Sequence, residues 1–140
     1  MMEVINLQNW DLGLDEYGIN KKRYRELKAF CLQYPNWKEK EAEILESGRN
    51  LTDMPVVKNH ISDPTQKKGF ALILSNVTSK IKLIEETARE VDVIMAEYLI
   101  RNVTTRYNGY HELVNCGMTC SRSDFYRKRR QFFCYLNKKV

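Results

Sequence analysis

Apolar residues recur three and four positions apart along most of this chain, which is the spacing of one face of an α-helix. The longest series ends at Val91 and follows the pair Asp63-Pro64. Asp63 can cap a helix, and Pro64 suits the first helical position because the proton it lacks would have no partner there. The pattern predicts a helix over residues 64–90 with one narrow apolar stripe. That stripe needs a partner, either a helical hairpin formed by residues 21–47 or the same helix in a second copy of the chain.

Shorter series predict two helices near the start of the chain, over residues 21–34 and 37–47. Pro35 separates them, because the residue before a proline avoids the helical region and proline has no amide proton. Gly48 closes the second helix, and the turn-forming residues that follow predict a loop up to position 62.

The whole pattern predicts an all-α protein in three parts. Residues 1–20 show little periodicity and are interpreted as an arm that either docks on the protein or is mobile. Residues 21–91 form a helical scaffold, which could also mediate oligomerisation. Residues 92–140 form a unit of three helices, of which the first covers residues 93–103 after Asp92 as its N-cap.

The last third of the chain combines a short helix, a tight turn and a longer basic helix. Residues 107–114 form a short amphipathic segment, and Gly117 can take the positive φ of a turn without steric strain. Ser121, Ser123 and Asp124 are good N-cap residues, so the basic helix can begin among them. Two helices joined by a short glycine-containing turn predict a helix-turn-helix.

The final helix, predicted over residues 123–137, has one apolar and one polar face. Arg129 falls within the apolar stripe, so we expect its stem to pack while its charged head reaches solvent. Residues near the start of a recognition helix normally contact base edges in the major groove of DNA. The apolar stripe consists of Phe125, Phe132, Phe133 and Leu136, and the candidate base-reading residues are Ser121, Arg122, Ser123, Tyr126, Arg127 and Arg130.

The positive charge of the chain is concentrated in the same region. Residues 1–91 hold equal numbers of basic and acidic residues, whereas residues 92–140 account for the whole net charge of +5. A localised positive patch is the pattern expected for a polyanion partner, here double-stranded DNA. The alternative is a solvated basic face on a packing helix. The candidate phosphate-contacting residues are Thr104, Arg106, Tyr107, Lys128, Lys138 and Lys139.

Other sequence features argue against membrane, metal and catalytic roles. No apolar run is long enough to span a membrane, and the first ten residues lack the pattern of a signal peptide. Four cysteines without an export signal indicate free thiols in a reducing cytoplasm. The spacing of His111, Cys116, Cys120 and Cys134 differs from common zinc-finger spacings, so neither a metal nor a cofactor is expected. The chain has no glycine-rich phosphate loop, no nucleophile elbow and no histidine near paired carboxylates, so we do not expect an enzyme.

Two motifs, an early CLQYPNW at residues 31–37 and a late FYRKRRQFF at residues 125–133, are joined by SDPTQKK and KIKLIEETAREVD between them. With these motifs the chain resembles the ArpU and RinA group of phage and prophage transcriptional regulators, over nearly all of its length after about residue 20. The resemblance implies a C-terminal helix-turn-helix similar to the sigma-factor domain that reads the −35 element. It also implies activation of late phage genes for packaging, morphogenesis or lysis, in the cytoplasm of a bacterial host.

Two other functions remain open from the sequence. Small terminase subunits, which package phage DNA, are also helical, carry helix-turn-helix units and assemble into rings. A sigma-like protein would instead bind bacterial RNA polymerase directly. A regulator could act as a homodimer through the helix over residues 64–90.

Overall fold

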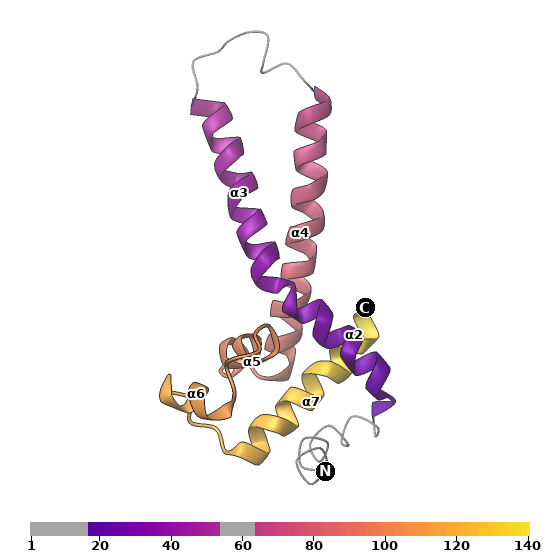
Figure 1. Cartoon of the computed structure of the whole chain (residues 1–140), viewed down its shortest axis with the longest axis vertical. Helices are drawn as coiled ribbons and strands as arrows, with labels where there is room; N and C mark the ends of the chain where they lie inside the picture. Colours follow the sequence, from indigo (N-terminus) through magenta and orange to yellow (C-terminus); the bar gives the residue numbers. More distant parts are fainter. Residues whose placement is uncertain (1–16, 54–63) are drawn as a thin grey trace. The chain divides into compact units, whose positions relative to one another are not determined.

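A computed structural model of the chain describes the backbone of residues 17–53 and 64–140 and the side chains of residues 17–47 and 68–140. The described residues form α-helices and no strand, so the predicted all-α class is confirmed (Figure 1). The helices are α2 (Lys21–Leu32), α3 (Tyr34–Asp53), α4 (Pro64–Val91), α5 (Ala96–Val103), α6 (Tyr110–Asn115) and α7 (Arg122–Lys139).

The helices are divided between two compact units. The hairpin unit contains residues 34–82, which are α3 and most of α4. The main unit contains residues 17–33 and 83–140, which are α2, the last turns of α4, and α5 to α7. These units differ from the predicted boundaries at residues 20 and 91, because α2 and the end of α4 belong with the C-terminal helices.

In the hairpin unit, α3 and α4 run in opposite directions and contact each other near the start of α3 (Figure 1). The Thr78 hydroxyl donates a hydrogen bond to the Glu41 carboxylate at 3.1 Å. The Lys80 ammonium lies 5.4 Å from the centre of the Trp37 ring, which is buried. The predicted long helix is therefore present from Pro64, and α3 of the same chain supplies a partner for its stripe.

The boundaries of α3 differ from the prediction at both ends. The helix begins at Tyr34, so Pro35 lies in its first turn rather than in a break. Proline is tolerated there because the first amide groups of a helix have no intrahelical acceptor. At the other end α3 continues through Gly48 to Asp53, so residues 48–53 are helical rather than the start of a loop. The predicted cap at Asp63, the rest of that loop and most of the predicted N-terminal arm lie outside the described residues.

In the main unit, α7 packs against α2 and α5 (Figure 1). The predicted apolar stripe of α7 is confirmed, because all four of its residues are fully buried. The helices around it contribute aliphatic residues that complete the core. These are Leu27 and Cys31 from α2, Ile84 and Ala88 from α4, and Leu99 and Val103 from α5.

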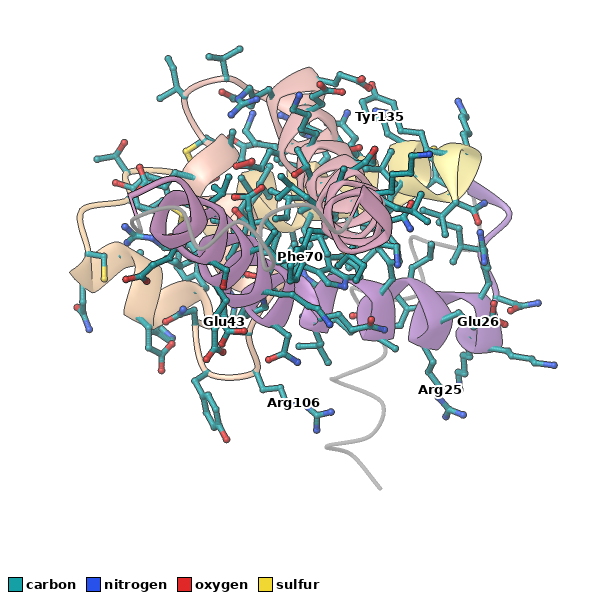
Figure 2. All side chains as sticks on the ribbon, turned by 90° about the horizontal axis from the view of Figure 1, so that it is seen from above. Arg25, Glu26, Glu43, Phe70, Arg106 and Tyr135 are labelled. Atoms are coloured by element: carbon teal, nitrogen blue, oxygen red, sulfur yellow. The ribbon has the colours of Figure 1, made fainter. Side chains whose placement is uncertain are left out.

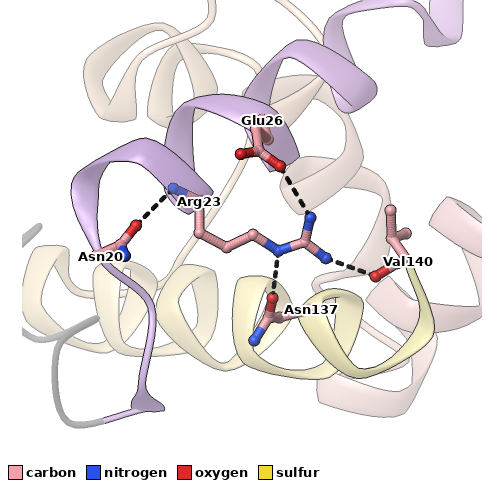
Figure 3. A network of polar contacts seen from close by, with 5 residues as sticks. All are labelled: Asn20, Arg23, Glu26, Asn137 and Val140. Carbon is pink, nitrogen blue, oxygen red and sulfur yellow. Dashed lines mark hydrogen bonds and ion pairs between the residues drawn. The ribbon is translucent and has the colours of Figure 1, made fainter.

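The position of α2 was not predicted, since the sequence pattern paired it with the following helix. Its Arg23 side chain instead reaches the end of α7 (Figure 3). The Arg23 guanidinium donates to the side-chain oxygen of Asn137 at 2.6 Å and to the backbone carbonyl of Val140. Asn20 caps α2 by accepting a bond from the Arg23 amide. The C-terminal end of α7 is therefore held by the N-terminal end of α2.

The turn between α6 and α7 has the hydrogen bonds of a Schellman motif. The Met118 amide donates to the Leu113 carbonyl and the Gly117 amide to the Val114 carbonyl, both at 3.0 Å. Gly117 has a φ of +106°, which confirms its predicted role. Ser121 then caps α7 by accepting a bond from the Asp124 amide. A short helix, a glycine turn and a capped basic helix thus follow one another as predicted.

Two neighbouring helices begin later than predicted. The first, α5, starts at Ala96 rather than at position 93, because the Asp92 carboxylate accepts bonds from the Ile94 and Met95 amides in a turn before the helix. The second, α6, starts at Tyr110 rather than at position 107. The segment between α5 and α6, residues 104–109, is therefore longer and less regular than the sequence indicates. We call this segment the linker.

We expect Gly117→Ala to destabilise the protein by about 1 kcal/mol, because an L-residue is strained at this positive φ. The nearest atom to the added methyl group is the Tyr98 hydroxyl at 3.7 Å, so the strain is conformational rather than steric. Gly69→Ala is the matched control. It lies inside α4 with open space around it and should stabilise by about 0.5–1 kcal/mol. Urea unfolding followed by circular dichroism measures both, and a change of the same sign at the two glycines would contradict the explanation.

Candidate nucleic-acid interface

The first turns of α7 present a polar and basic surface to solvent. Ser121, Arg122, Ser123 and Arg127 are all exposed. Arg127 keeps 57% of its side chain accessible while forming an ion pair with Asp124 at 3.2 Å. An exposed pair of this kind is weak, so its guanidinium can exchange partners at little energetic cost. These four predicted base-reading residues therefore lie together on one accessible end of the helix.

The other two predicted base-reading residues, Tyr126 and Arg130, are half-buried. The ring of Tyr126 packs edge-on against buried Phe125, with centroids 5.4 Å apart. The Arg122 guanidinium lies 5.9 Å from the centre of the same Tyr126 ring. Tyr126 therefore forms the boundary between the exposed face of α7 and the core.

Arg129 is not at the surface, so the prediction that its head reaches solvent is wrong. The residue is 4% exposed. Its guanidinium donates to the side-chain oxygen of Asn102 at 2.8 Å and to the Tyr24 hydroxyl at 2.6 Å, and it lies 5.0 Å from the centre of the Phe133 ring. A buried cation is tolerated when hydrogen bonds replace its water, and these partners join α2, α5 and α7. Arg129 therefore serves the fold rather than the surface.

Three of the residues predicted to contact phosphates make contacts within the main unit. Thr104 is buried, and its hydroxyl donates to the Ile100 carbonyl within α5. Lys128 pairs with Asp92 at 2.9 Å, and this hydrogen bond is the main reason that the pKa of Asp92 is lowered. Lys139 pairs with Glu90 at 2.7 Å and donates to the Thr87 hydroxyl. Lys128 and Lys139 therefore join α7 to the end of α4 and the turn after it, whereas Thr104 bonds within its own helix.

The remaining phosphate candidates lie on accessible surface. Arg106 and Tyr107 belong to the linker, and Tyr107 is 85% exposed. Arg106 extends away from the helices into solvent (Figure 2). Lys138 is exposed near the end of α7. The basic surface of the last third is therefore smaller than its net charge suggests, and most of its candidate residues lie at the start of α7 and in the linker beside it.

A lysine that the sequence analysis did not single out, Lys28 of α2, lies behind the linker. Its ammonium donates to the carbonyls of Val103 and Asn102 at 3.0 and 3.2 Å, and more distantly to that of Thr105 at 3.5 Å. These are orphan acceptors at the end of α5, where the helix dipole also favours a positive charge. Burial, followed by the charge of Arg129, lowers the pKa of Lys28 to about 8. No sequence pattern points to this role, since the partners are more than 70 positions apart.

Residues of the linker, α2, α5 and α7 line an open pocket of about 350 Å³. Three cations contribute to it, and no aspartate or glutamate is among the described residues that line it. Tyr126 at its rim also borders the exposed face of α7, so the pocket and the candidate base-reading surface are continuous. The lining residues are Lys28, Asn102, Thr105, Arg106, Asn108, Gly109, Tyr126 and Arg129.

The cysteines and the histidine considered as zinc ligands differ in their exposure to solvent. His111 and Cys116 are exposed, and Cys120 and Cys134 are half-buried free thiols. Within residues 17–53 and 64–140, no three His, Cys, Asp or Glu side chains are grouped as a metal site would require. The helices in the same ranges include none with the length and apolar character of a membrane span.

Comparisons of the chain with protein-family models, with curated proteins and with solved structures find no match.

We expect Arg129→Ala to lower the free energy of unfolding by roughly 3 kcal/mol, because it removes a buried side chain and leaves the half-buried Asn102 oxygen and Tyr24 hydroxyl without this donor. Arg127→Ala, two positions away, removes only an exposed ion pair and should change stability by less than about 0.5 kcal/mol. Urea denaturation of both variants, monitored by circular dichroism, tests whether Arg129 contributes much more to stability than Arg127 does. Equal losses of stability would refute it.

Proposed function

We propose that this protein binds duplex DNA sequence-specifically and regulates transcription, with the start of α7 in the major groove. The proposal rests on a difference in exposure between the first turns and the later turns of α7. Its later turns are fixed by the core, whereas its first turns expose Arg122, Ser123 and Arg127 directly after a tight glycine turn. A rigid helix with a polar, cationic first turn is suited to reading base edges.

Each part of the main unit has a physical role in this proposal. Arg127 can form two parallel hydrogen bonds to the acceptors of a guanine, and Ser123 can contact either base of a pair. Arg106 in the linker and Lys138 in the last turn of α7 supply charge for phosphates, and phosphate contacts set the register in which the bases are read. The Schellman turn and the Ser121 cap fix the angle at which α7 begins.

The regulatory role rests on the resemblance to phage regulators of the ArpU and RinA group. On that resemblance the target genes are late phage genes, and the protein acts as an activator in the cytoplasm of the bacterial host. Activation requires contact with RNA polymerase in addition to DNA. A sigma-like protein would bind core polymerase without DNA. A pull-down with core enzyme alone therefore distinguishes a sigma-like protein from an activator that reaches the polymerase through DNA.

A packaging role is the second candidate, favoured by apolar residues on the surface of the hairpin unit. Leu72 is 65% exposed and Ile73 40% exposed on α4, and Leu45 of α3 is also exposed. Such residues can support assembly of several copies, as in the rings of small terminase subunits. Mass in solution discriminates the two functions. A monomer, or a homodimer through α4, supports the regulator, and a closed ring supports packaging.

We expect Arg127→Ala to lower affinity for the preferred duplex by about 1–3 kcal/mol, the contribution of one good base contact, with little effect on unrelated duplexes. The preferred duplex is first enriched from a random pool with the wild-type protein, and affinities are then measured by fluorescence anisotropy. Equal losses on both duplexes would remove the base-reading assignment of Arg127.

Lys139→Ala is the matched control for this measurement. It removes a positive charge from the same helix, but its ammonium is already paired with Glu90. Affinity for both duplexes should therefore stay within about twofold of the wild type. A large uniform loss would show that the end of α7 contacts phosphates after all.

A further inference from the structure

The basic helix proposed to enter the groove contains one acidic residue. Helix α7 has seven lysines and arginines, and its single acid is Asp124. That residue lies in the first turn, and 52% of its side chain is accessible. A carboxylate at this end of the helix is repelled by the phosphates of a duplex. Asp124 therefore weakens binding to DNA of any sequence, unless it also improves one of the contacts that recognise bases.

The carboxylate of Asp124 faces the guanidinium of Arg127, which lies about one turn later on the same side of the helix. One carboxylate oxygen of Asp124 lies 3.2 Å from Nη2 of Arg127. Residues three positions apart are neighbours on a helix surface, so the pair forms within α7 itself. Among the described residues, the Arg127 guanidinium has no other ion pair or hydrogen bond. The one acid of α7 is therefore placed against the arginine proposed to recognise guanine.

We infer, on the basis of the proposed function, that Asp124 is a positioning residue, which holds the Arg127 guanidinium in the orientation that contacts a guanine in the major groove. A guanidinium has five N–H donors, so one can face Asp124 while two others meet the O6 and N7 acceptors of the base. Because the two contacts use different donors, the ion pair persists in the complex. Asp124 itself contacts no base in this arrangement and acts through Arg127.

Two properties of the first turn suit Asp124 to this task. Its backbone amide donates to the Ser121 hydroxyl at 3.3 Å, so the start of its side chain is held by the helix cap. An arginine side chain has several rotatable bonds, and a partner that restricts them reduces the entropy lost on binding. The pair is weak while water surrounds it. In the groove that water is displaced, so the attraction between the two charges increases when the base is contacted.

The alternative role of Asp124 is to stabilise the helix. An acid in the first turn interacts favourably with the helix dipole, whatever the helix binds. The chain offers a matched control in Glu97, which lies in the first turn of α5 and pairs with Arg101 at 2.6 Å. Asp124→Asn and Glu97→Gln should both lower the melting temperature by roughly 1–5 °C. Only Asp124→Asn should alter DNA recognition.

The first test measures the affinity of the full-length variants for the preferred duplex and for an unrelated duplex. Asp124→Asn should lower affinity for the preferred duplex by about three- to tenfold, because Arg127 loses its orientation. The same variant should bind the unrelated duplex up to about threefold more tightly, because a negative charge has been removed. Glu97→Gln should leave both affinities unchanged. Equal effects of Asp124→Asn on the two duplexes, in either direction, or no effect would overturn the positioning role.

The second test identifies the base pair whose recognition depends on Asp124. Duplexes are enriched from a random pool with the wild type, with Arg127→Ala and with Asp124→Asn. If Asp124 acts through Arg127, both variants should lose preference at the same base pair and retain it at the others. Loss at a different base pair would mean that Asp124 contacts a base itself, as a carboxylate can with the amine of cytosine. That result would overturn the positioning role.

The double variant of Asp124→Asn and Arg127→Ala completes the comparison. Without Arg127, Asp124→Asn should no longer change the ratio of the affinities for the preferred and the unrelated duplex. If Asp124→Asn changes this ratio equally with and without Arg127, the two residues act independently and the positioning role is overturned, while DNA binding stands. A wild-type protein that enriches no duplex from the pool would overturn the proposed function, and the role of Asp124 with it.

Discussion

The buried guanidinium of Arg129 is the interaction on which the main unit depends. It joins α7 to Asn102 of α5 and to Tyr24 of α2, and it lies against the Phe133 ring. A cation in a core is stable only if its hydrogen bonds are satisfied, so the three helices must meet in one arrangement. That arrangement fixes the rotation of α7 about its own axis. Because the rotation is fixed, Arg127 points to solvent and Phe125 to the core.

The four consecutive cations of α7 show how a helix divides one charged sequence among different tasks. Successive residues are turned by about 100°, so neighbours face different surroundings. Arg127 is exposed, Lys128 pairs with Asp92, Arg129 is buried and Arg130 is half-buried. A cluster that reads in the sequence as a single basic surface therefore contributes much of its charge to internal structure. The candidate interface is correspondingly compact and includes the linker.

Features governed by local sequence could be predicted, and those governed by distant contacts could not. The apolar stripe of α7, the cap at Ser121 and the turn at Gly117 each depend on residues within one or two helical turns, and the structure contains all three. The burial of Arg129 depends on Tyr24, 105 positions away, and the position of Lys28 depends on the end of α5. Pro35 shows a further limit, since a proline can stand at a break or in the first turn of a helix, and the residues around it suit both.

The interleaving of the two units has a consequence for synthesis on the ribosome. The hairpin unit is contiguous in sequence, so it can form as soon as α4 has emerged. Helix α2 is synthesised earlier, but it cannot form its final contacts until α7 has emerged, because its bonds to α7 span more than 100 residues. Until then Leu27 and Cys31, which are buried in the finished protein, have no α7 to cover them. A chain that ends before α7 therefore exposes the apolar face of α2 to the proteases and chaperones of the cell, and only chains that contain the last helix cover it.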